Sequence, residues 1–289
     1  MFGLVRTLRK AIRKYLMKIL GIILIVIIVV PTLLYFLQRR MIYFPGKYEP
    51  GYRDWLPPGA VEIEYETSSG KQVCFYIPQA GGEGKPPARL WMLFGGNASL
   101  ALHWLDFIGE FPGEAPAFLL IDYPGYGFCE GRPGFHSIGE NSRAAFSALA
   151  RNLETTEAVL GKELGVMGHS LGCAAALQFA AGHPVKRAIL IAPFTSLLEM
   201  ARRSVGWPLC HILRDRFDNR SVLQQILSRP SPPEIHVLHG TGDEIVPFNM
   251  GKSLSDSFPG KIGFHPLEGS DHNSILFDAR EEMYRLMTR

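Results

Sequence analysis

The apolar residues of this chain follow two different patterns. Ile19 to Leu37 form one stretch of 19 residues without a charge, whereas the remainder alternates short apolar runs with polar segments. Helical patterns separate the later runs, and such alternation predicts an α/β fold: a mostly parallel sheet of about eight strands, helices on both faces, and the ligand site at the carboxyl ends of the strands. The runs that indicate strands lie near residues 61–66, 72–77, 89–94, 117–122, 164–168, 187–192, 234–239 and 261–266.

The long apolar stretch has the length of a membrane-spanning helix, since about 20 apolar residues cross the hydrocarbon core of a bilayer. Pro31 lies within it, which a membrane helix tolerates. The stretch leads directly to Gln38-Arg39-Arg40 without a small-residue cleavage site, so we expect an uncleaved signal anchor. The prediction is therefore a basic flank at residues 1–18, a transmembrane anchor at 19–38 and one α/β domain at 39–289.

Charge is concentrated around the predicted anchor. Six Lys and Arg and no acid precede the stretch, and four Lys and Arg follow it up to residue 55, which favours a cytoplasmic N-terminus and a domain at 39–289 on the periplasmic or lumenal side. Residues 1–40 hold eight bases and no acid, while the remainder holds 22 bases and 27 acids, a net charge of −5. The overall charge of +3 therefore belongs to the membrane flanks and does not indicate a nucleic-acid partner.

The sequence Gly-His-Ser-Leu-Gly at residues 168–172 separates a predicted strand from the small-residue run Cys173 to Ala181, which predicts a helix. This is the context of a G-x-S-x-G nucleophile elbow. Glycine is needed on either side of the serine because a Cβ would clash in so tight a bend. The pattern predicts Ser170 as a nucleophile at the edge of the sheet. We expect the side chain of His169 to point elsewhere and to pack or hydrogen-bond locally.

A serine nucleophile needs a base and an acid that orients the base, and in this arrangement they follow in the order Ser, Asp or Glu, His. Asp243 lies in a glycine-flanked turn after the predicted strand at 234–239, and His272 follows the last predicted strand. We therefore predict Ser170, Asp243 and His272 as a catalytic triad. Glu244 and Asp271 are neighbouring alternatives for the acid. His239 ends a strand and is interpreted as a structural hydrogen-bonding residue.

Acyl transfer also requires two N–H groups that bind the developing oxyanion. The residue after the nucleophile, Leu171, is expected to supply one of them. The second is expected from the loop Gly95-Gly96-Asn97-Ala98, which follows the strand predicted at 89–94. Asn97 is favoured as this donor, with Ala98 as the alternative.

Several longer motifs match a known family. They are the elbow, Arg40-Met41-Ile42-Tyr43-Phe44-Pro45, Gly96-Asn97-Ala98, Asp122-Tyr123-Pro124-Gly125-Tyr126-Gly127, Ala192-Pro193-Phe194-Thr195-Ser196, Arg214-Asp215-Arg216-Phe217-Asp218 and residues 239–247. Over residues 39–289 the chain resembles the alpha/beta-hydrolase superfamily of serine hydrolases, and within it the membrane-anchored subgroup that includes the fungal bud-emergence protein and other single-pass alpha/beta-hydrolase-domain proteins. The resemblance implies hydrolysis of a carboxylic ester, thioester or amide. Gly95 departs from the family pattern, which has a histidine at that place in the oxyanion loop.

Two further segments bear on function. Residues 199–232 are longer than a simple connection and predict a small helical cap over the site, with apolar residues beside several arginines. Such a cap would suit an acyl chain with an anionic head, or it could be an ordinary amphipathic helix pair packed on the sheet. The four cysteines lack metal-site spacing, and a bridge from Cys129 to Cys74 or Cys210 stays open. Cys173 is expected to be a small core residue.

Together these features predict a membrane-anchored serine hydrolase, of the esterase, thioesterase or lipase-like kind. Its substrate would be a small-molecule or lipid acyl compound, cleaved through an acyl-enzyme without a metal or a cofactor. Two alternatives remain from the sequence. One is a non-catalytic membrane-tethered interaction protein of the same fold, and the other is an aminopeptidase-like amide hydrolase.

Overall fold

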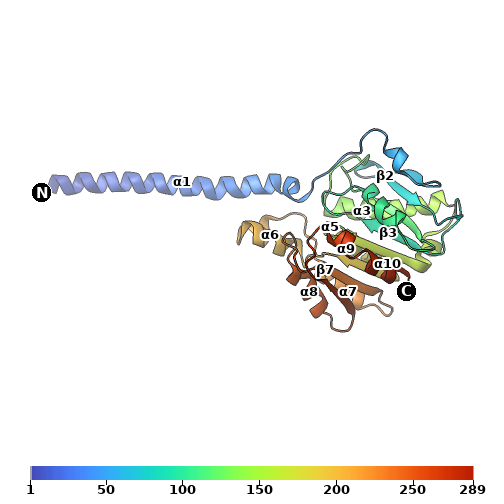
Figure 1. The fold of residues 1–289 in the computed structure, drawn as a ribbon. Helices are drawn as coiled ribbons and strands as arrows, with labels where there is room; N and C mark the ends of the chain where they lie inside the picture. Colours follow the sequence, from blue (N-terminus) through green and yellow to red (C-terminus); the bar gives the residue numbers. More distant parts are fainter. Residues whose placement is uncertain (1, 289) are drawn as a thin grey trace.

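The computed structural model describes residues 2–288, in which one long helix extends from an α/β domain (Figure 1). The helix, α1, runs from Phe2–Ile42, through the predicted flank and anchor and into the first residues of the predicted catalytic segment. Its part from Leu8–Ile42 is long and apolar enough to cross a membrane. The most apolar 18 residues of this part have a mean hydropathy of 3.0, and none of these 18 residues is buried inside the structure. α1 therefore presents an apolar surface that the domain does not cover.

The domain is built on one eight-stranded sheet with the order β1-β2-β4-β3-β5-β6-β7-β8. In the described part of the chain, β2 alone runs in the opposite direction, antiparallel to β1 and β4, and the other neighbouring strands are parallel. The predicted mostly parallel sheet is confirmed, and each predicted strand lies where an observed one does. The strands are β1 Val61–Thr67, β2 Gly70–Ile77, β3 Leu90–Phe94, β4 Ala117–Ile121, β5 Leu164–His169, β6 Arg187–Ile191, β7 Glu234–Gly240 and β8 Ile262–Leu267.

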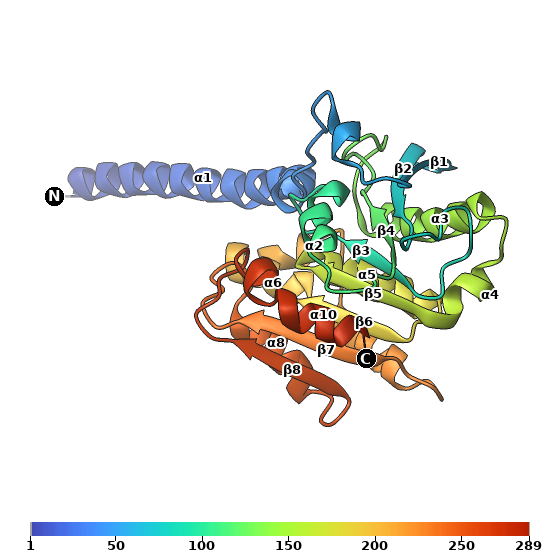
Figure 2. The same ribbon diagram turned by 45° about the vertical axis from the view of Figure 1, so that its right-hand side comes forward.

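Helices cover both faces of the sheet (Figures 1 and 2). α2 and α10 lie together on one face, joined by a hydrogen bond from Tyr284 Oη to the Phe107 carbonyl, and α3, α5, α7 and α8 cover the other. The helices of the domain are α2 Leu105–Gly109, α3 Phe135–Asn152, α4 Glu157–Leu160, α5 Leu171–Gly182, α6 Leu197–Val205, α7 Asn219–Leu227, α8 Phe248–Asp256, α9 Ile275–Asp278 and α10 Arg280–Thr288, with short 3-10 turns η1 Tyr52–Trp55, η2 Ala101–Trp104, η3 Gly161–Glu163 and η4 Leu209–Ile212.

The central strands are apolar on both faces because helices cover both of them. Every residue of β3, β4 and β5 is buried, whereas β1 and β8 are partly exposed at the edges of the sheet. The small residues of α5 let this helix approach the sheet, and its Phe179 packs against Phe94 and Phe146. The most fully buried part of the core therefore lies directly beneath the end of β5, where the predicted nucleophile follows.

The region predicted as a cap divides into two parts. α7 packs on α5 and buries Leu223, Ile226 and Leu227 against the sheet face. α6 and η4 lie instead beside the end of α1, on the side of the domain from which α1 extends (Figure 1). We use the name cap below for residues 197–215, which comprise α6, η4 and the three residues that follow η4. The four cysteines, all within the described residues, are free and buried.

Candidate active site

The turn between β5 and α5 has the geometry of a nucleophile elbow. Ser170 adopts φ 55° and ψ −115°, a backbone conformation that costs a non-glycine residue on the order of 1–3 kcal/mol. The flanking glycines explain how the turn fits. A Cβ on Gly168 would lie 2.2 Å from the Gly172 carbonyl oxygen, and one on Gly172 would lie 2.1 Å from the Phe94 carbonyl oxygen. The turn therefore holds the Ser170 side chain at the carboxyl edge of the sheet, only 8% exposed.

The loops after β7 and β8 bring Asp243 and His272 together. His272 Nδ1 lies 2.7 Å from Asp243 Oδ2, and it donates this hydrogen bond because an ionised carboxylate only accepts. The other carboxylate oxygen, Oδ1, accepts the backbone N–H groups of Ile245 and Val246 at 2.9 and 2.8 Å. Oδ2 of Asp243 thus binds His272, while Oδ1 binds the backbone of the loop. Among the hydrogen bonds of residues 2–288, none joins Ser170 Oγ to His272, a bond that is often long before substrate binds.

The two alternative acids do not reach the histidine. Glu244 is exposed, and Asp271 is exposed and uses its carboxylate to accept the N–H groups of Asn273 and Ser274. Asp243, in contrast, is 6% exposed and bonded directly to His272. Of the three acids that the sequence brings near this edge, Asp243 is the one in position to orient the imidazole.

His239 gives Asp243 a second polar neighbour. Its Nε2–H donates to the Val246 carbonyl at 2.9 Å and lies 3.3 Å from Asp243 Oδ2. Burial would raise the pKa of Asp243, but the hydrogen bonds from His239 and His272, with the charge of His272 and the Val246 N–H, lower this pKa well below its usual range. Asp243 is therefore held as a carboxylate. The sequence suggested a structural hydrogen bond for His239, but not that the bond supports the acid.

His169 braces the loop that carries His272. Its Nε2 lies 2.8 Å from the His272 carbonyl oxygen, so Nε2 carries the proton that it donates. Burial, together with the nearby His272, lowers the pKa of His169 to about 4, which keeps the ring neutral at neutral pH. The two imidazole rings lie 4.8 Å apart between centroids. His169 is thus packed and buried as expected, but its hydrogen bond is not local, because it reaches the backbone of His272, 103 positions along the chain.

The oxyanion loop after β3 faces the start of α5. Leu171 begins α5, where the first N–H groups of a helix have no intrahelical partner. Within residues 2–288 no hydrogen bond uses the N–H of Asn97, whereas its carbonyl and its amide side chain are both engaged. Asn97 Nδ2 donates to the Ile42 carbonyl at 3.0 Å, and the N–H of Phe44 donates to the Asn97 carbonyl at 2.9 Å. The end of α1 therefore fixes the loop that carries the second predicted donor.

Two tyrosines of the Asp122-Tyr123-Pro124-Gly125-Tyr126-Gly127 motif also brace this loop, a role that the sequence analysis did not assign. Tyr123 Oη donates to the Gly95 carbonyl at 2.7 Å, and Tyr126 Oη donates to the Asn97 carbonyl at 2.6 Å. A Cβ on Gly95 would lie 2.9 Å from the Ser99 Cβ. Gly95 stands where the resembled family has histidine, and here the loop is held by the hydrogen bond from Tyr123 to the backbone carbonyl of Gly95. The one signal in the sequence for this role is the place of the motif directly after the strand predicted at 117–122, at the sheet edge where the oxyanion loop also lies.

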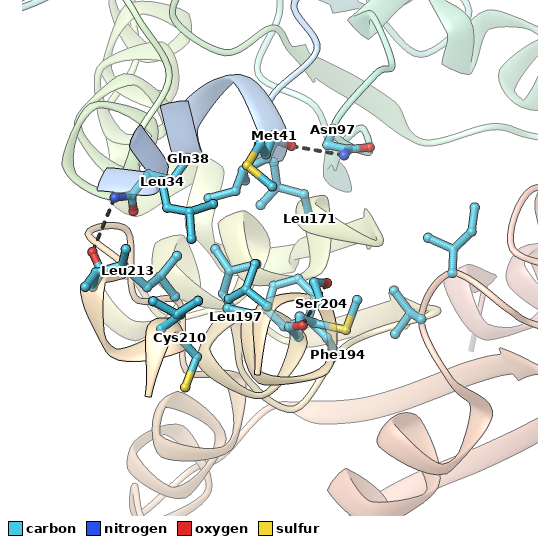
Figure 3. A pocket seen from close by; sticks show the side chains of 18 of the residues that line it. Leu34, Gln38, Met41, Asn97, Leu171, Phe194, Leu197, Ser204, Cys210 and Leu213 are labelled. Carbon is cyan, nitrogen blue, oxygen red and sulfur yellow. Dashed lines mark hydrogen bonds between the residues drawn. The ribbon is translucent and has the colours of Figure 1, made fainter. Parts of the chain in front are cut away.

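A cavity of about 230 Å³ opens beside Ser170 (Figure 3). Its floor is formed by Ser170, Leu171 and Asn97, and its walls come from the cap and from the end of α1. Apolar side chains make up most of the lining. Cys173 lies outside this lining, donates to the Gly168 carbonyl at 3.0 Å, and has a pKa raised by burial, so it packs as a small core residue.

The sequence has relatives that match most of its length. A protein of Mycobacterium tuberculosis described as uncharacterized is 31% identical over 255 residues, which cover 87% of this chain and 86% of that protein. The model of the "Alpha/beta hydrolase family" matches residues 92–231, from β3 to the end of α7. The chain belongs to the alpha/beta-hydrolase family. Among other relatives, the human alpha/beta hydrolase domain-containing protein 17B is 27% identical over 212 residues, covering 72% of this chain and 68% of that protein.

Solved structures agree on the fold of this alpha/beta hydrolase. An alpha-beta hydrolase from Vibrio vulnificus superposes with a TM-score of 0.64, covering 86% of this chain and 89% of that one. An esterase from Pyrococcus furiosus superposes with a TM-score of 0.59, covering 86% of this chain and 96% of that one. Both are 14% identical to this chain, so they show the alpha/beta-hydrolase fold and do not by themselves show the reaction.

Proposed function

We propose that this alpha/beta hydrolase is a membrane-anchored serine hydrolase that cleaves a carboxylic ester or a thioester through an acyl-enzyme. The observation that carries the proposal is that Ser170 stands in a strained elbow at the floor of an apolar cavity, at the same sheet edge as the hydrogen-bonded pair of Asp243 and His272. This combination supplies a nucleophile, a base and an orienting acid. Esterases among the structural neighbours support the same class of reaction.

The proposed reaction follows from these positions. Ser170 Oγ attacks the acyl carbonyl carbon while His272 Nε2 takes the hydroxyl proton, and Asp243 holds the Nδ1–H of the resulting imidazolium. The N–H groups of Leu171 and Asn97 bind the oxyanion. When the tetrahedral intermediate collapses, the bond to the leaving alcohol or thiol breaks and His272 gives that group the proton. Water then attacks the acyl-enzyme by the same route, releasing a carboxylic acid and restoring the serine. The steps require no metal or cofactor.

We propose further that α1 anchors this hydrolase as a single-pass helix, with the N-terminus in the cytoplasm and the catalytic domain on the periplasmic or lumenal side. The uncovered apolar surface of α1 supports the anchor, and the excess of Lys and Arg on the N-terminal side supports this orientation. The same features, with the motifs after the anchor, support a place in the membrane-anchored subgroup that includes the fungal bud-emergence protein.

Two other functions use the same fold. A non-catalytic interaction protein is favoured by Gly95, which replaces the histidine of the resembled family in the oxyanion loop. The Tyr123 hydrogen bond to the Gly95 carbonyl lessens that argument, because the loop is braced without the histidine. An aminopeptidase-like amide hydrolase would need to bind a charged amino group, and the mainly apolar lining of the cavity favours an acyl chain instead.

A fluorophosphonate probe tests the proposal, because it reacts with activated serines and leaves a mass adduct. We expect the full-length protein in detergent to be labelled at Ser170, as located by peptide mass, and the Ser170→Ala variant to remain unlabelled while unfolding at the same temperature. We also expect the wild-type protein to hydrolyse p-nitrophenyl acetate and Ser170→Ala to lose several orders of magnitude in kcat. A folded wild-type protein that stays unlabelled would favour the non-catalytic alternative.

A further inference from the structure

The end of α1 forms part of the cavity that contains Ser170. One face of this helix is turned toward the domain. Pro31, Leu34 and Ile42 are half-buried and Gln38 is buried, whereas most of the residues between them are exposed. These positions have the spacing of one helical stripe. Leu34, Gln38, Met41 and Ile42 line the cavity, opposite the cap residues Leu197 and Leu213 (Figure 3). The wall of the site therefore includes side chains of the proposed anchor.

The cavity reaches the uncharged part of that helix. Leu34 lies within the stretch from Ile19 to Leu37, and Arg39 and Arg40 are the first charges that follow it. At 1.5 Å of rise per residue, Leu34 is about 7.5 Å along the helix axis from Arg39. Arginines that flank a membrane helix lie at the level of the lipid headgroups. One end of the cavity is thus placed at the depth of the hydrocarbon, and the other is at Ser170.

Specific contacts hold the cap side of the cavity against α1. Gln38 Oε1 accepts the N–H of Arg214 at 2.7 Å, and its Nε2 donates to the Ile212 carbonyl at 3.3 Å. Arg39 pairs with Asp215 at 3.2 Å, and Asp215, which is 4% exposed, also accepts the N–H of Phe135. Because a buried carboxylate needs its partner, this pair fixes the end of α1 relative to the cap.

The cap carries side chains of the types that are common in proteins at the membrane surface. Trp207, between α6 and η4, is 73% exposed, and Arg202 and Arg203 stand in the last turn of α6. Tryptophan is enriched at the boundary between lipid and water, and arginine is attracted to the anionic lipid headgroups there. Figure 1 shows α6 on the side of the domain toward which α1 extends. The cap therefore lies on the side of the domain that would be nearest the predicted membrane.

We propose that the substrate is a long-chain acyl ester resident in the membrane, whose apolar chain enters the cavity from the bilayer along the face of α1 that carries Leu34 and Met41. This inference rests on the proposed function, since Ser170 must be the group that attacks the ester. Leu34, Leu197 and Leu213 give an apolar chain surroundings as apolar as the hydrocarbon that it leaves, so the chain can enter the cavity without the cost of passing through water. The anchor is then a part of the substrate-binding site as well as a tether.

The first test fills the cavity from the anchor side. Leu34→Trp adds bulk at the membrane end of the cavity, and Met41→Trp adds bulk nearer Ser170 at a site that is 53% exposed and so tolerates a larger side chain. Leu33→Trp is the matched control, because Leu33 is the same residue type on the same turn but is exposed and does not line the cavity. Each full-length variant is reconstituted in phosphatidylcholine vesicles and assayed with p-nitrophenyl acetate and p-nitrophenyl palmitate.

We expect either cavity variant to lower the ratio of kcat/KM for palmitate over acetate by about tenfold or more, the range in which an apolar pocket discriminates chain size. Leu33→Trp should leave this ratio unchanged. The inference is overturned if neither cavity variant changes the ratio, or if Leu33→Trp changes it equally. If the wild-type protein neither reacts with fluorophosphonate nor hydrolyses the acetate ester, the proposed function itself has failed.

The second test addresses the route of the chain. p-Nitrophenyl palmitate is placed either in the same vesicles as the protein or in separate vesicles of the same composition, while the water-soluble acetate ester serves as the reference. We expect faster hydrolysis of palmitate in the shared bilayer and no difference for acetate. Equal initial rates for palmitate in the two arrangements would overturn access from the bilayer.

Discussion

Replacing Asp243 by asparagine is the most informative change at the candidate site, because the structure determines how the amide must lie. Asp243 Oδ1 accepts two backbone N–H groups, from Ile245 and Val246, and Oδ2 faces His272 Nδ1. If the amide nitrogen took the Oδ1 position, both backbone donors would lose their acceptor, at a cost of about 1–3 kcal/mol for the buried N–H of Val246. The oxygen of the new amide will therefore stay with the backbone, and its NH₂ group will face His272.

An NH₂ group in that position donates to His272 Nδ1 and so favours the tautomer with the proton on Nε2. That tautomer cannot accept the proton of Ser170, and the wrong tautomer costs on the order of 10⁴ in kcat in serine hydrolysis. The corresponding loss of transition-state stabilisation is about 5.5 kcal/mol. Stability should change much less than activity, because the backbone contacts of residue 243 are kept.

The assay is steady-state hydrolysis of p-nitrophenyl acetate together with the rate of fluorophosphonate labelling, with thermal unfolding as the control for folding. Glu244→Gln and Asp271→Asn are the matched controls, since both acids are close in sequence to the candidate residues but exposed. Both should retain kcat near the wild-type value. The reasoning is refuted if a folded Asp243→Asn protein keeps near wild-type kcat, or if Asp271→Asn reproduces the loss.

Two further predictions concern the support of the site. His169 has a pKa lowered to about 4 in the folded protein, below the ordinary value of 6.5. As the pH falls, the histidine of the unfolded chain therefore gains its proton before that of the folded protein. The free energy of unfolding should drop by about 3 kcal/mol from pH 7 to pH 4 because of this group. Urea unfolding at several pH values should show a shallower acid-side decrease for His169→Gln than for wild type, and equal slopes would contradict the buried neutral ring. Gly172→Ala places a Cβ 2.1 Å from the Phe94 carbonyl oxygen, and we expect it to lower stability by about 1–3 kcal/mol or more and to suppress labelling of Ser170. Gly182→Ala, whose Cβ would meet nothing within 4 Å at the end of α5, is the control, and comparable destabilisation of both variants would argue against the elbow clash.

Much of the fold was predictable because its signals are local. The eight strands are short apolar runs between turn residues. Runs of that length indicate strands whichever other strand they pair with in the sheet. The elbow is similarly local, since its two glycines are required by atoms within a few residues or on the adjacent strand end. The chain order of Ser170, Asp243 and His272 predicted which loops meet, because the carboxyl ends of parallel strands lie along one edge of a sheet. The catalytic roles of these residues stay predictions until the variants are measured.

The glycine-flanked turn favoured Asp243 among the neighbouring acids, but the surroundings that distinguish this acid and the support of the oxyanion loop come from contacts between distant segments. Asp243 differs from Glu244 and Asp271 in burial and in its bonds to His239 and His272, which no spacing in the sequence encodes. Tyr126 reaches Asn97 across 29 positions of the chain. The direction in which such side chains point is set by packing, and packing is a property of the assembled layers.

The sequence by itself determined the strands, the elbow, the order of the candidate triad and the apolar character of α1, since each follows from periodicity or from the needs of a few adjacent residues. Only the tertiary structure decided that the end of α1 lies against the cap and the oxyanion loop, through Gln38, Arg39 and the Ile42 carbonyl. These contacts join residues 55 to 176 positions apart. Hydrogen bonds of that separation form only after the sheet has brought the segments together, so the wall that α1 adds to the cavity could not be inferred from the pattern of the chain.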